Sequence, residues 1–378
     1  MLLSYHRRNT MAVSPQPPAQ PIRLEVRAGA GPYPVEIGAG AAGALGAFLD
    51  QLHVPVRRFV VSSPVVWRFH GERLHGASTE EPILVPDGER SKHLATVGRI
   101  YDALIHASAD RATTIVAIGG GVIGDMAGFA AATYLRGIPV VQVPTTLLAQ
   151  VDSAIGGKVG VNHPMGKNLI GAFHPPAAVL ADPELLATLP RREFRAGLYE
   201  VVKYGVIASH DLFDRVGSSM KGLFARDATA LLPIIAESCR IKAGIVEQDE
   251  REAGPRRALN FGHTAGHALE AVTKFRRFRH GEAVAYGMRV AAEVGVARGV
   301  FRPADRDALS SLLTQMGPLP AVADLSAAQV LEAMKRDKKV VAGRLQFVLP
   351  IAIGATRIVD DVRSEELTEA LTRVGLGV

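Results

Sequence analysis

The stretch that decides the fold is residues 113–128, TTIVAIGGGVIGDMAG, where an apolar run leads into glycines and then into a helical pattern. Gly119, Gly121 and Gly124 match the spacing G-x-G-x-x-G at the point where a strand would pass into a helix. In that setting the backbone amides at the helix start receive the pyrophosphate of a dinucleotide. A glycine turn that binds nothing is the alternative that this motif alone leaves open.

The ribose of such a dinucleotide would lack its usual partner. An acidic residue commonly follows the glycines by about 20 positions, but that region here reads VVQVPTTLL. The candidates for the ribose contact are Asp125, or Glu89 and Lys92 of the earlier stretch PDGERSK. We therefore expect a bound dinucleotide to be held differently from the common pattern.

Short β-branched runs alternate with helical segments on both sides of this stretch, from residue 22 to about 190, which predicts a mostly parallel sheet covered by helices. The expected strands are RRFVVSS, EPILVPDG, TTIVAIGGG and IPVVQVPTT, after an antiparallel hairpin of IRLEV and YPVEIG. Amphipathic segments dominate beyond residue 190, with one late β pair, RLQFVLPIAIG and TRIVD. We predict a tail over residues 1–21, an α/β domain over 22–190 and a mainly α-helical domain over 191–378.

Length and composition agree with two domains. A chain of 378 residues with 48% hydrophobic composition exceeds one ordinary core. The 43 Lys and Arg against 37 Asp and Glu are spread along the chain, which favours anionic small substrates over nucleic acid. The single cysteine, Cys239, suits a reducing compartment, so we expect a cytoplasmic protein. We expect the first 21 residues to be a disordered tail, because no apolar segment there is long enough for a signal peptide.

The segment VDSAIGGKVGVNHPMGKNLIGAFHPP, residues 151–176, reads as an unusually long glycine-rich connection. It carries Lys158, Lys167 and Asn168, and it follows the pair Thr145 and Thr146. Long connections of this kind are usually functional or disordered. Two lysines among glycines suit a phosphate or carboxylate group, whereas a solvated loop with surface lysines is the alternative.

The helical half carries a possible metal site. Glu200 and Lys203 are spaced as a plain intrahelical ion pair, and His263 and His267 could be hydrogen-bonded core residues. His280, at the expected start of the next helix, changes this interpretation. Two imidazoles and one carboxylate on neighbouring helices form a three-ligand set with an open coordination position, typical of catalytic zinc. The spacing does not fix which two histidines bind.

Two glycines precede these histidines in LNFGHTAGHALE, at positions 262 and 266. A glycine inside a helix costs about 1 kcal/mol relative to alanine. We expect Gly262 and Gly266 to let neighbouring backbone or a bound molecule approach where a side chain would block it.

Four stretches together resemble the 3-dehydroquinate synthases of the sugar-phosphate cyclase superfamily: GGGVIGDMAGFAAATYLRG, VPTTLLAQVDSAIGGKVGVNHPMGKNLIGAFHPP, LNFGHTAGHALE and HGEAVAYGM. The resemblance runs from about residue 22 to the C-terminus. It implies a dehydroquinate synthase-like fold, with an α/β N-terminal Rossmann-like NAD domain, a mainly α-helical C-terminal domain and an active site between them. It also implies NAD+ and Zn2+ or Co2+ as cofactors, a homodimer, and neither a nucleic-acid nor a membrane partner.

The resemblance assigns roles to individual residues. The implied metal ligands are Glu200, His263 and His280, with His267 lying behind them or handling a proton. The implied NAD contacts are Asp87, Gly88, Glu89, Lys92, Gly121, Val122, Ile123, Gly124, Asp125, Thr145, Thr146, Asp152, Lys158 and Lys167. The implied catalytic and substrate-binding residues are Arg136, Lys158, Lys167, Asn168, Lys203, Lys242, Arg256, Asn260, His267 and one lysine of RDKK, taken to be Lys338.

The implied reaction converts 3-deoxy-D-arabino-heptulosonate 7-phosphate to 3-dehydroquinate and phosphate, a lyase step of the shikimate pathway. It proceeds through transient oxidation by NAD+, β-elimination of phosphate, re-reduction and intramolecular aldol closure. The nearest alternative is another sugar-phosphate cyclase, such as a 2-epi-5-epi-valiolone or 2-deoxy-scyllo-inosose synthase, whose substrate lacks the carboxylate. Those relatives tend to differ at the positions of Asn260 and the DKK lysine, both of which this chain keeps.

Two further alternatives are weaker. Metal-dependent alcohol or glycerol dehydrogenases share the architecture but lack the stretch GGKVGVNHPMGKN. A scaffold or nucleic-acid-binding protein would explain the net charge of +6. Neither a scaffold nor a nucleic-acid-binding protein would require a glutamate, two histidines and many polar residues at matching positions.

Overall fold

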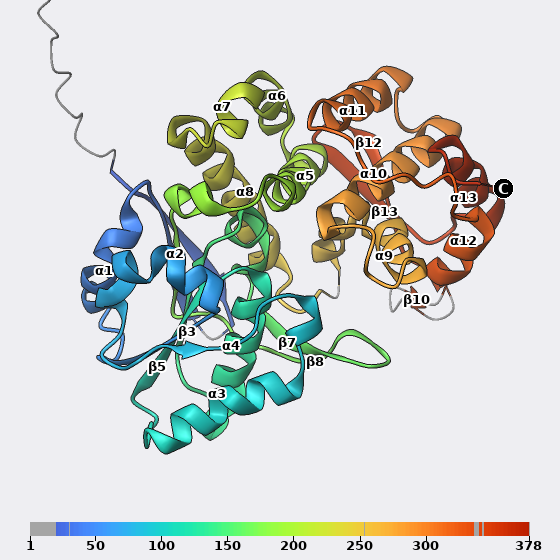
Figure 1. Cartoon of the computed structure of the whole chain (residues 1–378). Coiled ribbons are helices and arrows are strands. Elements are labelled where there is room, and N and C mark those ends of the chain that lie inside the picture. Colours follow the sequence, from blue (N-terminus) through green and yellow to red (C-terminus); the bar gives the residue numbers. More distant parts are fainter. Residues whose placement is uncertain (1–19, 30, 253, 336–339, 342–343, 378) are drawn as a thin grey trace, which may run out of the picture.

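The computed structural model describes residues 20–29, 31–252, 254–335, 340–341 and 344–377 (Figure 1). Most of the expected tail, and Lys338, lie outside the described residues. The N-terminal half forms a sheet flanked by helices, and the C-terminal half forms a group of helices beside it, coloured orange and red at its far end. This agrees with the predicted fold class.

A seven-stranded sheet organises the N-terminal half, in the order β1-β2-β9-β6-β5-β3-β4. Its strands are β1 (Ile22–Ala28), β2 (Gly31–Ile37), β3 (Arg57–Ser62), β4 (Ile83–Leu84), β5 (Thr113–Gly119), β6 (Val140–Pro144) and β9 (Ala178–Ala181). Only the expected hairpin of β1 and β2 is antiparallel; the other pairs are parallel. Every residue of β5 and β6 is buried, as is typical of strands covered on both faces.

Helices cover the two faces of this sheet. They are α1 (Leu45–Gln51), α2 (Pro64–Leu74), α3 (Leu94–His106) and α4 (Gly121–Thr133). Alternate residues of β5 belong to different cores: Ile115 and Ala117 share one with α3 and α4, whereas Val116 and Ile118 share another with α1 and α2. The strand therefore needs apolar residues at every position, and the apolar run before the glycines supplies them.

The C-terminal half is mainly helical around one continuous core. Its helices are α5 (Arg191–Ala208), α6 (His210–Ser218), α7 (Met220–Phe224), α8 (Ala228–Gln248), α9 (His263–Val272), α10 (His280–Ala297), α11 (Pro303–Gln315), α12 (Ala327–Lys335) and α13 (Ser364–Arg373). The late β pair is confirmed as β12 (Phe347–Ala352) against β13 (Ala355–Val359), and β10 (Val340–Val341) pairs with β11 (Arg344–Leu345). No helix in the described ranges is long and apolar enough to cross a membrane.

The interpretation of residues 151–176 as one long connection is wrong. Most of the segment forms an antiparallel hairpin of β7 (Lys158–His163) and β8 (Gly166–Phe173). Val159 and Val161 of β7 are buried in the core that contains α4. Gly160 lies opposite Gly171, and a Cβ on Gly160 would come 2.5 Å from the Ile170 carbonyl oxygen. The glycines therefore allow two backbones to meet, and they hide the strand pattern in the sequence. The short strand β9 also goes unpredicted.

The glycines around the histidines allow close backbone contact, as expected. Gly262 precedes α9 as its N-cap with a left-handed φ of 78°, so only Gly266 lies inside the helix. A Cβ on Gly262 would lie 2.7 Å from the Val284 carbonyl oxygen, and one on Gly266 would lie 3.0 Å from that of Ala283. What approaches these glycines is the backbone of α10.

Helix α10 has matching glycines of its own. A Cβ on Gly287 would lie 1.7 Å from the Gly262 carbonyl oxygen, and one on Gly281 would lie 1.9 Å from that of Ala196 in α5. Real Cβ atoms do not come this close to backbone oxygen. Helices α5, α9 and α10 are therefore held at a spacing that any side chain at these positions would widen.

We predict that Gly287→Ala lowers the free energy of unfolding by roughly 1–3 kcal/mol or more, because the added methyl group meets backbone that has no rotamer to change. Chemical denaturation of the purified variant measures this. Gly98→Ala is the matched control, because it lies in α3 with no atom within 4 Å of the new Cβ. Alanine there should be neutral or stabilising by up to about 1 kcal/mol; equal stability of both variants would contradict the close-contact argument.

Candidate active site

Three helices bring one carboxylate and two imidazoles together. Glu200 lies within α5, whereas His263 and His280 are the first residues of α9 and α10. Glu200 Oε1 lies 3.7 Å from His263 Nε2 and 3.6 Å from His280 Nε2. The carboxylate is fully buried: its Oε2 forms an ion pair of 2.5 Å with Lys203, but its Oε1 has no hydrogen-bond partner. A buried carboxylate oxygen without a partner is costly, and its position between two imidazoles fits a cation.

The orientation of each imidazole is fixed by the nitrogen that faces away from Glu200. His263 Nδ1 lies 3.1 Å from the Phe261 carbonyl oxygen, and His280 Nδ1 lies 3.3 Å from Glu270 Oε2. Both acceptors require a proton on Nδ1, which leaves the Nε2 lone pair directed toward Glu200. This is the tautomer that a metal ligand needs.

His267 belongs to the same cluster. His263, His267 and His280 offer ring nitrogens that all lie within 4.8 Å of one another. The centroids of the His267 and His280 rings are 5.7 Å apart, and those of His263 and His267 are 5.4 Å apart. The structure thus brings together all four residues that the resemblance places at the metal, and a three-histidine set is geometrically available beside the set with Glu200.

Lysines and carboxylates form ion pairs next to this cluster. Asp152 Oδ1 accepts hydrogen bonds from Lys242 Nζ at 2.7 Å and from the Tyr204 hydroxyl at 2.5 Å. Burial alone would raise the pKa of Asp152, but the charges of Lys242 and Lys203 outweigh it and lower that pKa. Burial lowers the pKa of Lys242, and Asp152 opposes this effect. Asp152, expected at the dinucleotide, is therefore bonded to Lys242, which was expected at the substrate.

A further acid, Glu252, holds two of the expected anion-binding residues. Asn260 Nδ2 donates to Glu252 Oε1 at 2.6 Å, and Lys158 Nζ forms an ion pair with Oε2. Arg256 is buried nearby and donates to the carbonyl oxygens of Glu250 and Gly156. Sequence reasoning missed Glu252, because an acid in the run QDERE gives no sign that it will neutralise a cation from a distant hairpin.

The start of α4 fits the phosphates of a dinucleotide. Gly120 is the N-cap and supplies no side-chain cap. The first amides of a helix have no partner within the helix, so those of Gly121, Val122 and Ile123 can bind an anion. A Cβ on Gly124 would lie 2.7 Å from the Gln142 side-chain oxygen, so glycine there allows α4 to pack closely against β6.

Lys92 connects this helix to the hairpin. Its buried ammonium donates to Asp125 Oδ2 and to Asn168 Oδ1, both at 2.5 Å. Lys167, which precedes Asn168 in β8, lies 3.9 Å from Glu89 Oε1 and 3.2 Å from Glu270 Oε1. A continuous set of contacts thus runs from the glycine turn to the histidines.

The remaining predicted site residues are Thr145, Thr146, Asp87, Gly88 and Arg136. Thr145 donates its backbone amide to the Gly119 carbonyl oxygen at 2.9 Å, and a Cβ on Gly120 would lie 3.0 Å from the Thr146 methyl group. Asp87 and Gly88 are exposed and bond to each other. Arg136 is exposed after α4 with a φ of 68°, and none of its described hydrogen bonds or ion pairs reaches the buried cluster.

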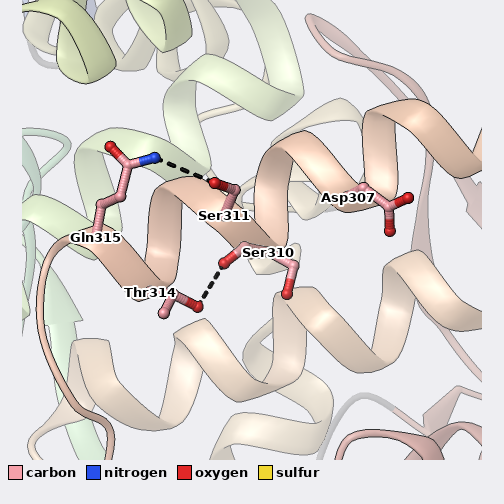
Figure 2. A pocket seen from close by; sticks show the side chains of 5 residues that line it. All are labelled: Asp307, Ser310, Ser311, Thr314 and Gln315. Carbon is pink, nitrogen blue, oxygen red and sulfur yellow. Dashed lines mark hydrogen bonds between the residues drawn. The ribbon is translucent and has the colours of Figure 1, made fainter.

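An open surface hollow on α11 does not compete with this site. Figure 2 shows its five lining side chains, Asp307, Ser310, Ser311, Thr314 and Gln315. Gln315 donates to the Ser311 hydroxyl at 3.1 Å, and Thr314 donates to the Ser310 carbonyl oxygen at 2.7 Å. The hollow holds none of the expected residues and no basic group or histidine, so it offers no chemistry for an anionic substrate.

Glu282, in the first turn of α10, holds that helix against α5. Its buried carboxylate accepts two hydrogen bonds from Arg192, at 2.8 and 2.7 Å, and one from Arg195 at 3.2 Å. It also accepts from the Arg279 backbone amide at 2.9 Å. Burial alone would raise the pKa of Glu282, but the hydrogen bonds from Arg192, the Arg279 amide and Arg195, together with the charge of Arg192, lower that pKa. These charged hydrogen bonds hold α10 against α5, and they help to keep His280 opposite Glu200.

Comparison with known proteins identifies the family of the chain. Residues 82–196 match the family model described as 3-dehydroquinate synthase N-terminal, and residues 197–340 match the one described as 3-dehydroquinate synthase C-terminal. The chain belongs to the 3-dehydroquinate synthase family. The 3-dehydroquinate synthase of Gloeobacter violaceus is 48% identical over 93% of this chain and 98% of its own length. That of Pelotomaculum thermopropionicum is 46% identical over 92% of this chain and 96% of its own length.

Solved structures of related cyclases share the fold of this dehydroquinate synthase family member. A 2-epi-5-epi-valiolone synthase from Streptomyces hygroscopicus subsp. jinggangensis, with NAD+ and Zn2+ bound, has a TM-score of 0.82 at 27% identity, over 90% of this chain and 96% of its own. A 2-deoxy-scyllo-inosose synthase complexed with carbaglucose-6-phosphate, NAD+ and Co2+ has a TM-score of 0.83 at 25% identity, over 94% of this chain and 100% of its own. The dehydroquinate synthase-like fold class is confirmed.

We predict that Glu282→Gln lowers the free energy of unfolding at pH 7 by roughly 1–3 kcal/mol, because charged hydrogen bonds to two arginines are lost. A carboxyl group whose pKa is lowered in the folded state stabilises the fold above its unfolded pKa of about 4.3, and it loses this effect as the pH falls through the lowered value. The difference between wild type and variant should therefore shrink below about pH 4. Denaturation curves at pH 7 and below pH 4 measure this difference in the free energy of unfolding. A difference independent of pH would contradict the role of the charged Glu282 carboxylate.

Proposed function

We propose that this protein converts 3-deoxy-D-arabino-heptulosonate 7-phosphate to 3-dehydroquinate and phosphate, as a carbon–oxygen lyase of the shikimate pathway. The observation that carries the proposal is the buried Oε1 of Glu200, which has no hydrogen-bond partner and faces two imidazole Nε2 atoms beside the buried Lys203 and Lys242. Membership of the dehydroquinate synthase family supplies the substrate class.

For the metal, we propose Glu200, His263 and His280 as the ligands of Zn2+ or Co2+. Support comes from the shared direction of Glu200 Oε1 and the two Nε2 atoms, and from the Nδ1 partners that fix both tautomers. A cation there would polarise a substrate hydroxyl group. His267 lies against these ligands, and we propose that it handles a proton.

For the dinucleotide, we propose that the amides at the start of α4 hold the pyrophosphate and that Asp125, Lys92 and Glu89 lie along the ribose side. Support comes from the glycine N-cap of α4 and from the Lys92 bonds to Asp125 and Asn168. NAD+ in this place would take up hydride from the substrate and return it within one turnover. The two related cyclases described above are solved with NAD+ bound, which supports NAD+ as the dinucleotide.

The chain's own lysines, arginines and amides bind the substrate and orient it. Lys203, Lys242 and Arg256 are buried and cationic, so they can fix a carboxylate and a phosphate through charged hydrogen bonds. Lys158 and Asn260 pair with Glu252 here, and we propose that they exchange this carboxylate for a substrate anion. Elimination and aldol closure depend on holding one substrate geometry, and the number of converging donors meets that need.

The alternative, a cyclase whose substrate has no carboxylate, has less support. The two solved cyclases of that kind described above are 25% and 27% identical to this chain, whereas dehydroquinate synthases reach 48%. The homodimer, the cytoplasmic location, and the domain division into 22–190 and 191–378 stay predictions. The contacts of Arg136 with substrate also stay a prediction.

We predict that the purified protein releases inorganic phosphate from the heptulosonate phosphate when NAD+ is present only in catalytic amounts. No NADH should accumulate, because each turnover returns the hydride. Removing the metal with a chelator should abolish phosphate release, and adding Zn2+ or Co2+ should restore it. Phosphate detection and absorbance at the NADH wavelength measure both; NADH accumulating with turnover would indicate a dehydrogenase instead.

We predict that Glu200→Gln loses bound metal and reduces turnover more than about 100-fold, beyond the loss typical of groups that only support a ligand. The reason is that the variant replaces the only carboxylate facing both Nε2 atoms among the described residues. Metal analysis of the purified variant checks this. Glu237→Gln on the exposed side of α8 is the control and should keep its metal; full metal occupancy in the Glu200 variant would exclude Glu200 as a ligand.

A further inference from the structure

Glu270 is a buried carboxylate beside a proposed metal ligand. It lies two turns into α9, and its side chain is 5% exposed. Its two oxygens have different partners: Oε2 lies 3.3 Å from His280 Nδ1, and Oε1 lies 3.2 Å from Lys167 Nζ. One side chain therefore joins a proposed metal ligand to the β7–β8 hairpin of the other half.

We propose that Glu270 is the positioning residue of the metal site, which sets the tautomer and the orientation of His280. This inference rests on the proposed function, because it concerns the same metal. A carboxylate that accepts from Nδ1–H holds the proton on that nitrogen and leaves Nε2 to bind. Nε2 of His280 does face Glu200 Oε1, at 3.6 Å.

The two histidines differ in how they are held. His263 uses the Phe261 carbonyl oxygen, a neutral acceptor on the adjoining backbone. His280 uses a carboxylate from another helix. A hydrogen bond to an ionised acceptor is roughly twice as strong as one between neutral groups, and it makes the imidazole a more basic ligand. Metal affinity should therefore depend on Glu270 through His280.

Lys167 fixes the carboxylate from the opposite side. Its ammonium contacts Glu270 Oε1, and it also lies 4.3 Å from the centroid of the Phe275 ring, just beyond α9. Figure 1 shows the β7–β8 hairpin extending from the sheet toward the helical half, where this contact is made. With one oxygen anchored by Lys167, the other is held in position for His280. The hairpin thus supports the metal site without contacting the metal.

The test is the affinity of the metal-free protein for Zn2+ alone, measured by competition with a chelator. Glu270→Gln keeps the shape of the side chain but removes its charge, so we expect binding to weaken about 10- to 100-fold while the thermal unfolding curve keeps its shape. The matched control is Glu293→Gln. Glu293 is another largely buried carboxylate, further along α10, whose partners are Arg306 and Arg373. This control should bind Zn2+ as the wild type does.

The possible results of this measurement distinguish failure of the Glu270 inference from failure of the proposed function. Wild-type affinity in Glu270→Gln overturns the inference and leaves the proposed metal site standing. A wild-type protein with no Zn2+ site overturns the proposed function itself. If Glu270→Gln does not fold, NMR of the wild-type protein with 15N-labelled histidine decides the matter. On addition of Zn2+, His280 should keep its proton on Nδ1 and bind through Nε2, whereas binding through Nδ1 would overturn the inference.

Discussion

Backbone contact between three helices is the constraint on which the candidate site depends. Gly262 and Gly287 allow α9 and α10 to touch without an intervening side chain, and Gly281 does the same between α10 and α5. Because α9 and α10 each begin with a histidine, this contact places both imidazoles beside Glu200. Metal–ligand distances tolerate only about 0.2 Å of error, so a helix spacing widened by one methyl group would separate the set.

A second constraint is charge. Buried cations are costly unless they are paired, and in this structure Lys242 is paired with Asp152, and Lys203 with Glu200. Lys158, which is partly exposed, pairs with Glu252. A substrate with both a carboxylate and a phosphate group would compete with these carboxylates for the same lysines. The protein thus keeps its cationic groups in place before substrate arrives, and the exchange of one anion for another need not rebuild the site.

Much of this could be predicted from sequence, because it depends on local pattern. The run of apolar residues into Gly119 predicted β5 and the start of α4, and the β1–β2 hairpin and the late β pair followed from alternation. The β7–β8 hairpin was misread, since glycines such as Gly160 break the alternation that marks a strand. Glu252 and Glu270 were missed because their partners lie far away in sequence. Spacing alone also could not choose among three histidines, since the choice depends on the acceptors at Nδ1.

Substrate selectivity has to come from a part of the fold other than the metal helices and the glycine turn. Cyclases for other substrates have nearly the same architecture, with TM-scores of 0.82 and 0.83, and are solved with NAD+ and a divalent metal. The metal helices and the glycine turn therefore cannot by themselves distinguish a sugar phosphate that carries a carboxylate from one that does not. The connection between α8 and α9 carries Glu252, Arg256 and Asn260, and it reaches Lys158 of the hairpin. Arg256 and Asn260, which we propose to bind substrate anions, lie in this connection and not among the proposed metal ligands, so changes there should alter the preferred substrate while leaving the proposed redox chemistry intact.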